Sequence, residues 1–187
     1  KESSAASDVY KRQYGESLMI ELEILQFPDE RLHRKAEIIE TIDENLKELA
    51  QAMLEKMYAT EGVGLAATQV GVLRRLIVMD ISQEQNSPWV LINPEVIDAK
   101  GEITEQEGCL SLPGLYADVT RAEKVKIRAS TLEGQVIEKE WDGLLAKCIQ
   151  HEIDHLEGIL FIQRLSPLKQ SRLKAKFLKM KKKEKMS

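Results

Sequence analysis

One segment constrains this sequence more than any other: residues 151–155 read His151-Glu152-Ile153-Asp154-His155, the pattern HExxH. On a helix, the two histidines would lie on one face, about 6 Å apart along the axis, with the glutamate beside them. Two imidazoles so placed can bind one metal ion next to the carboxylate. Because the chain has only three histidines and two of them occur here, among Ile and Leu residues, the pattern favours a metal-binding helix over two surface histidines.

A catalytic metal site needs a third protein ligand and an open position. Phe161 stands where a metzincin has its third histidine, and beyond residue 157 the only glutamate is Glu184, so two protease classes are disfavoured. A thiolate suits a site with two imidazoles, but Cys148 would lie about 10.5 Å along the helix from His155. Cys109, in a segment with Gly and Pro, is the favoured third ligand, and a packing role for it remains the alternative.

The 187 residues are 43% hydrophobic and 31% charged, which predicts one globular domain. No apolar run approaches the roughly 18 residues of a membrane-spanning helix, and the N-terminus has no secretory or transit pattern. Two cysteines are too few for a disulfide framework, which favours a reducing cytoplasm. Residues 1–18 are polar and aperiodic, and we interpret them as a disordered leader or a cloning scar.

Hydrophobic patterning predicts a single α+β domain. The small-residue segment of residues 62–71 is expected to be a loop. Apolar and alternating runs predict strands at residues 20–25, 76–79, 89–92, 125–129 and 136–141. The third of these is expected to end at Asn93-Pro94, and the last two to form a hairpin with one wet face.

Helical spacing predicts helices at residues 41–59, 142–157 and from residue 166 onward. Thr41 with Glu44 makes a capping box for the first. Asp142 can cap the second and Gly158 is placed to end it, while Ser166-Pro167 opens the lysine-rich third.

Three segments together resemble the motifs of bacterial peptide deformylases. They are GVGLAATQ at Gly62–Gln69, EGCLS at Glu107–Ser111 and QHEIDH at Gln150–His155. The resemblance runs from about Met19, which looks like the natural start, through the final helix. It implies an α+β fold in which antiparallel β-sheets surround a central HExxH metal-binding helix, with an N-terminal helix and a basic C-terminal helix.

The resemblance also implies an activity, which is removal of the N-formyl group from the formyl-methionine of newly synthesised polypeptides. Cys109, His151 and His155 would hold one divalent metal ion, with Fe(2+) expected physiologically and Zn(2+), Ni(2+) or Co(2+) able to substitute. Metal-bound water would attack the formyl carbon, with Glu152 as general base and then general acid. The Gln69 amide and the Leu110 backbone N–H would stabilise the oxyanion.

For the substrate, backbone groups of Val63 and Gly64 would pair with the extended peptide as an added strand. Leu144 and Cys148 are expected to wall the methionine pocket, and Lys147 is an unexpected polar residue in that stretch. Two rival functions remain, a zinc endopeptidase and a nucleic-acid-binding domain with a structural metal. A thiolate ligand argues against the first, and a glutamate beside the metal argues against the second.

Charge divides the chain unevenly. Residues 166–187 hold nine Lys or Arg and one acidic residue, a net of +8, which leaves −12 for residues 1–165. We therefore divide the chain into the leader at 1–18, a catalytic domain at 19–165 and a basic helical extension at 166–187. The extension is either a solvated helix docked by Leu173, Phe177 and Met180, or a contact with ribosomal RNA where formylated chains emerge. A cytoplasmic monomer without membrane contact is expected.

Overall fold

A computed structural model describes residues 20–187. The predicted leader at 1–18 and the predicted start at Met19 lie outside the described residues. Seven antiparallel strands form two sheets within the described part of the chain. The larger has the order β1-β2-β3-β6-β7, built from β1 (Gly64–Ala66), β2 (Leu76–Met79), β3 (Trp89–Lys100), β6 (Lys124–Ser130) and β7 (Val136–Asp142). The smaller pairs β4 (Ile103–Gly108) with β5 (Tyr116–Arg121).

The predicted strands at 76–79, 125–129 and 136–141 are confirmed as β2, β6 and β7, and the last two pair as a hairpin. The predicted strand at 20–25 is wrong, because this extended segment joins neither sheet. Its Leu25 N–H donates instead to the Gln69 carbonyl, 2.7 Å away, which ties it to the segment after β1.

Two further expectations need correction. The segment at 62–71 is no simple loop, because it contains β1 and the 3-10 helix η2 (Ala67–Val70), and its small residues are buried. Nor does β3 end at Asn93-Pro94. It continues to Lys100 with register shifts between Ile92 and Glu95 and between Val96 and Asp98, which absorb the missing N–H of the proline.

The three predicted helices are present as α2 (Glu44–Ala59), α3 (Gly143–Leu156) and α4 (Pro167–Glu184). The cap of α2 differs from the prediction, because the Asp43 side chain, rather than that of Thr41, accepts from the Leu46 N–H at 2.9 Å. Asp142 sits at the N-cap of α3 without a side-chain bond. Gly158 ends α3 with φ of 75°, and Ser166 caps α4 as predicted.

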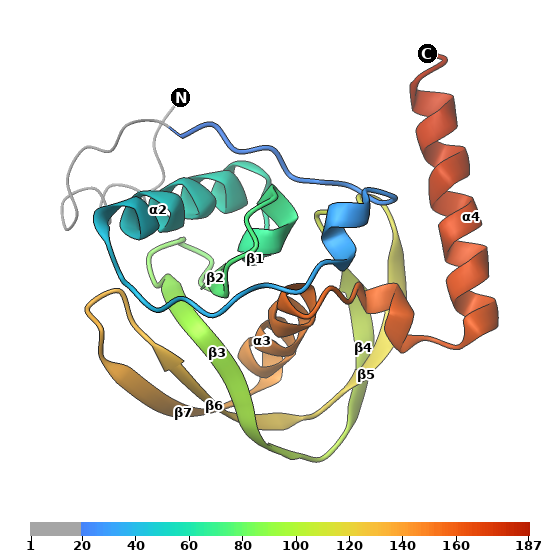
Figure 1. Cartoon of the computed structure of the whole chain (residues 1–187). Coiled ribbons are helices and arrows are strands. Elements are labelled where there is room, and N and C mark those ends of the chain that lie inside the picture. The colour runs from blue at the N-terminus through green and yellow to red at the C-terminus, as the bar shows by residue number, and fades with distance from the viewer. Residues whose placement is uncertain (1–19) are drawn as a thin grey trace.

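The helix that carries the HExxH segment lies in the middle of the fold. Figure 1 shows α3 between the long strands of the five-stranded sheet and the β4–β5 pair. Its apolar residues, including Ala146, Ile149 and Leu156, pack with strands β2, β3 and β6 in one core cluster. A second cluster lies between α2 and the sheet. Because α3 is amphipathic and its apolar face packs on the five-stranded sheet, its polar face is directed toward the β4–β5 pair.

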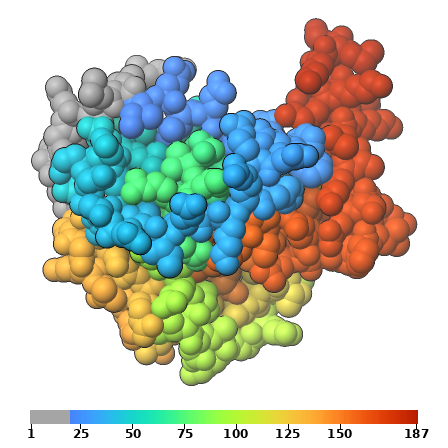
Figure 2. Space-filling model, viewed as in Figure 1, coloured from blue at the N-terminus to red at the C-terminus, as the bar shows by residue number. Residues whose placement is uncertain are grey.

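The basic helix α4 runs along one side of the body, and its C-terminal end stands clear of it (Figures 1 and 2). Phe177 is buried at 1% exposure, with its ring edge-on to Phe27 at 6.1 Å between centroids, and Leu173 packs beside it. The predicted apolar docking stripe is therefore present. Among the described residues, no helix is both long and apolar enough to span a bilayer.

Candidate metal centre

Three side chains from two distant segments converge on one point. His151 and His155 come from α3, and Cys109 follows directly after β4. The Nε2 atoms of the histidines are 3.2 Å apart, and Cys109 Sγ is 3.2 Å from His155 Nε2. All three potential ligand atoms lie within 4.8 Å of one another. The structure thus brings together the three residues that the sequence nominated as ligands, and Cys148 is not among them.

The surroundings of His151 are typical of a metal-bound imidazole. His151 Nδ1 faces Glu107 Oε2 at 2.9 Å. Although burial opposes it, hydrogen bonds from His151 and Arg121 lower the pKa of Glu107 to about 2, so this carboxylate is charged and accepts the Nδ1 proton. Although burial opposes it, interactions with Cys109 and Glu107 hold the pKa of His151 well above its usual value, so its Nε2 carries a proton that a metal ion would replace. This Nε2 faces His155 Nε2 at 3.2 Å. Such a carboxylate–histidine pair is the usual outer support of a metal-bound imidazole.

His155 also offers its Nε2 atom to the point where the three side chains meet. Burial lowers its pKa well below the usual value, so the ring is neutral. Its Nδ1 is buried and has no hydrogen-bond partner among the described side chains and backbone groups. Two imidazole nitrogens and a cysteine sulfur that converge on one point form a ligand set that suits a divalent ion with soft or borderline character. The residues present therefore fit a metal ion.

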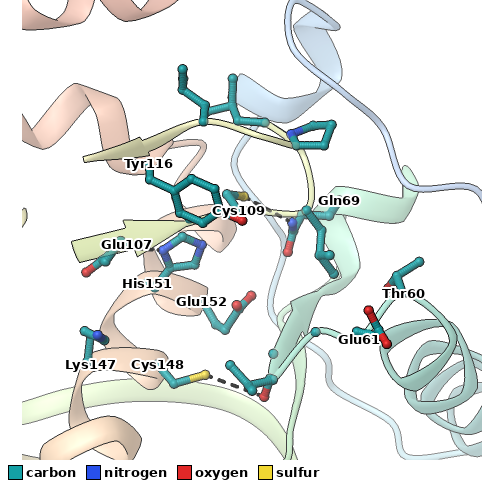
Figure 3. Close-up of a pocket in the computed structure, with 18 of the residues that line it drawn as sticks. Thr60, Glu61, Gln69, Glu107, Cys109, Tyr116, Lys147, Cys148, His151 and Glu152 are labelled. Carbon is teal, nitrogen blue, oxygen red and sulfur yellow. Dashed lines mark hydrogen bonds and ion pairs between the residues drawn. The ribbon is translucent and has the colours of Figure 1, made fainter. Parts of the chain in front are cut away.

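Glu152 lies beside this cluster, between α3 and β1, and points into the open space near His151 (Figure 3). It is buried at 3% exposure, and its Oε2 has no partner in the described part of the chain. Burial raises the pKa of Glu152 to about 7. A carboxyl group held in this way is suited to exchanging protons with a reactant.

The predicted oxyanion residues flank the cysteine. Gln69, buried within η2, accepts from the Ala66 N–H at 3.0 Å and donates to Ser111 Oγ at 3.1 Å. Its Nε2 also lies 3.7 Å from Cys109 Sγ (Figure 3). Leu110 follows Cys109 and lines the same pocket.

A pocket of about 480 Å³ opens in front of these groups, and the four predicted substrate-binding residues Val63, Gly64, Leu144 and Cys148 line it. Burial raises the pKa of the Cys148 thiol well above its usual value, so it is a neutral wall that donates to the Val63 carbonyl at 3.7 Å. Lys147 also lines the pocket, but its ammonium group is 3.0 Å from Glu105 Oε2, on β4.

Sequence reasoning missed the residues that support the ligands. Glu107 belongs to the quoted EGCLS segment, yet its bond to His151 required the fold. Tyr116, 61% exposed, covers Gly108 at the pocket edge. Arg121 and Asp154 are buried charged residues, and no sequence pattern predicts that they pair. The only available signal was the alternation of β4, which places Glu107 on the face opposite Gln106.

An enclosed HExxH helix, a cysteine-bearing loop and a buried carboxyl group are typical of the class of metal-dependent hydrolases. A family model described as polypeptide deformylase matches residues 21–171. A peptide deformylase of Neisseria meningitidis is 52% identical over 158 residues, 84% of this chain and 95% of that protein. Another, from Chromohalobacter salexigens, is 54% identical over 162 residues, 86% of this chain and 95% of that protein.

Solved structures agree. The crystal structure of a peptide deformylase from Legionella pneumophila matches with a TM-score of 0.85 and 45% identity, covering 90% of this chain and 99% of that one. The chain belongs to the peptide deformylase family. It is therefore an enzyme that removes the N-formyl group from nascent peptides, in a metal-dependent hydrolysis that forms part of protein biosynthesis.

Proposed function

We propose that Cys109, His151 and His155 hold the metal ion, and that Fe(2+) is the physiological one, with Zn(2+), Ni(2+) or Co(2+) able to substitute. The observation that carries the proposal is the approach of the three donor atoms, all within 4.8 Å of one another beside an open pocket. Two imidazoles and one thiolate suit any of these ions, and affinity order alone does not choose between them. Three protein ligands leave a position open for catalysis.

When bound, the ion supplies Lewis-acid chemistry, since it polarises the formyl oxygen and makes water more acidic. Glu152 would take a proton from the water that attacks the formyl carbon. It would then return the proton to the methionine nitrogen as the C–N bond breaks, which yields formate and a free amine. The raised pKa of Glu152, about 7 through burial, supports both halves of this transfer.

The charge that develops on the formyl oxygen needs donors close to Cys109. We propose the Gln69 side chain and the Leu110 backbone N–H. The Gln69 contact with Cys109 Sγ is long, at 3.7 Å, so that N–H can turn toward an oxyanion while the bond to Ser111 stays in place. Loss of one such donor typically lowers the rate by ~10²–10³.

The extended substrate would lie along β1, which is the outer strand of the five-stranded sheet. The Val63 carbonyl already accepts from the Asp80 N–H at 2.9 Å, so Gly64 is the better candidate for a main-chain bond to the peptide. The methionine side chain would enter between Leu144 and Cys148. Buried Gly64 has no side chain, which permits this close approach.

Formate release from formyl-Met-Ala, after anaerobic loading with metal, tests these roles. Glu152→Ala should keep the ion but lose about 10²–10⁴ of the rate, the usual contribution of a general base. Cys109→Ala should lose the ion itself. The exposed Glu102→Ala, a carboxylate outside the pocket, is the matched control and should behave as wild type. Activity that persists in Glu152→Ala would refute the mechanism.

We also propose that residues 19–165 form the catalytic unit of a cytoplasmic monomer, and that the extension at 166–187 contacts ribosomal RNA. The net charge of +8 on this extension supports the contact. Because Phe177 is part of the core, removing the helix would also damage the fold. Neutralising the exposed Lys176, Lys179 and Lys183 to Gln is a cleaner test.

If each of these lysines meets a phosphate, the salt dependence of ribosome binding should lose about one unit of slope per residue. Turnover of formyl-Met-Ala should stay unchanged. Unaltered ribosome affinity in the triple variant would contradict the proposed contact.

A further inference from the structure

A continuous row of charged side chains leads from His151 to the protein surface. Glu107, on β4, contacts His151 Nδ1 at 2.9 Å and accepts two bonds from Arg121, on β5, at 2.8 and 3.0 Å. Arg121 Nη1 lies 2.6 Å from Asp154 Oδ2, on α3. Arg164 closes the row with bonds to Asp154 at 3.0 and 2.5 Å.

Burial changes sharply along this row. The side chains of Glu107, Arg121 and Asp154 are 3%, 4% and 9% exposed, whereas that of Arg164 is 46% exposed. Arg164 ends the 3-10 helix η3 (Phe161–Arg164), which follows α3 in the chain. The row therefore joins two strands, the helix that carries the histidines and the segment after it.

Arg164 gives the row a second guanidinium group. Two carboxylates, Glu107 and Asp154, then face two guanidinium groups. Without Arg164, a single buried arginine would have to serve both carboxylates, and Asp154 would draw Arg121 away from Glu107. Because both guanidinium groups make two bonds to one carboxylate, each pair has a defined orientation as well as a charge.

We infer that Arg164 is a positioning residue for the metal centre: by holding Asp154, it keeps Arg121 on Glu107 and thereby fixes the ring orientation of His151. The inference rests on the proposed role of His151 as a ligand. Glu107 acts on the ligand directly, and Arg164 acts through three intermediate side chains. Outer partners of metal-bound histidines typically change metal affinity by 10–100-fold when they are altered.

Metal retention and thermal stability together distinguish a positioning role of Arg164 from a purely structural one. Half-exposed ion pairs contribute little to folding stability, because water screens them. Loss of the Arg164 head group should therefore change metal retention more than it changes the thermal midpoint of the protein. The effect should also depend on the two-pronged guanidinium, since lysine offers one ammonium and cannot span both carboxylate oxygens of Asp154.

The test uses the full chain loaded with Co(2+), whose visible absorption reports the ligand geometry. Arg164→Ala should shift the cobalt bands and release the ion to a chelator about 10-fold faster than wild type. Arg164→Lys should recover only part of the difference. Arg172→Ala removes an exposed arginine of α4 as the matched control and should release cobalt at the wild-type rate. Glu107→Gln should release cobalt faster than Arg164→Ala does, because Glu107 contacts His151 directly.

Two results would overturn the inference in distinguishable ways. If Arg164→Ala keeps the wild-type spectrum and release rate while Glu107→Gln does not, Arg164 has no positioning role and the proposed metal centre stands. If the wild-type chain binds no stoichiometric cobalt, or binds it with an unchanged spectrum in Cys109→Ala, the proposed centre itself fails and the inference with it.

Discussion

A single methyl group added at Gly64 should displace the proposed general base. A Cβ at this position would lie 2.7 Å from Glu152 Oε1 and 2.8 Å from Cys148 Sγ, whereas ordinary contact begins at 3.4 Å. To reach ordinary contact, the carboxylate oxygen must move by the difference, 0.7 Å. Gly64 has no left-handed φ, so the backbone of β1 accepts alanine without strain.

The size of the effect follows from that displacement. Glu152 is 3% exposed and lines the pocket, so a shift of its carboxylate changes its position relative to a bound substrate. A misplacement of about 1 Å in a catalytic group costs up to about 10²-fold in rate, or about 2.7 kcal/mol of transition-state stabilisation. We expect Gly64→Ala to lower kcat/KM by about this factor while the protein stays folded and keeps its metal.

The assay is formate release from formyl-Met-Ala, with metal content measured on the same sample. Gly134→Ala is the control, because a Cβ at Gly134 meets nothing within 4 Å in the turn between β6 and β7. Its φ of 80° costs some stability but should leave activity unchanged. Gly64→Ala with activity near that of wild type would refute the reasoning. Rescue by Cys148→Ala in the double variant would assign the effect to the sulfur contact instead.

Three further changes test the fold and the pocket. Gly158→Ala should destabilise the protein by about 2 kcal/mol or more in urea unfolding, because φ is 75° and a Cβ would clash with the His33 backbone; wild-type stability would contradict this. Phe177→Ala should cost about 3–5 kcal/mol in the same assay and speed hydrogen exchange in α4, and an unchanged midpoint would show that α4 is not docked. Lys147→Met should change turnover of formyl-Met-Ala by less than about fivefold, because Glu105 binds the ammonium at 3.0 Å; a larger loss would place the charge in catalysis.

The helices could be predicted because their signals are local. Spacing and caps placed α3 and α4 to within about two residues, and the HExxH pattern fixed which face His151 and His155 share. Thr41 was the wrong cap for α2 because Asp43 stands two residues later with an equally good side chain. Such a choice depends on where the preceding chain is held, and that is a tertiary property.

The strands were harder, for reasons that particular residues make clear. Every residue of β1 is buried, so Gly64–Ala66 has no alternation to reveal it. Asn93 looked like the end of a strand, yet its side chain bonds both backbone groups of Ile39, at 2.9 and 2.8 Å, and β3 continues beyond. Both features depend on partners far away in the sequence, which local patterns do not contain.

The same distinction applies to the site. The metal ligands could be predicted from residue type, whereas the residues that support them are brought together only by the fold. Cys109 could be nominated from the sequence because the chain offers few other metal ligands. The role of Glu107 could not, because it depends on how the end of β4 meets α3. Glu107 supports His151 at 2.9 Å, and Cys109, two residues later, reaches His155 at 3.2 Å. Gly108 between them is covered by Tyr116, whose ring would lie 2.6 Å from any Cβ there. A shift of this strand end would therefore disturb the cysteine sulfur and one imidazole together, so the contact between β4 and α3 must be kept for all three ligand atoms to meet at one ion.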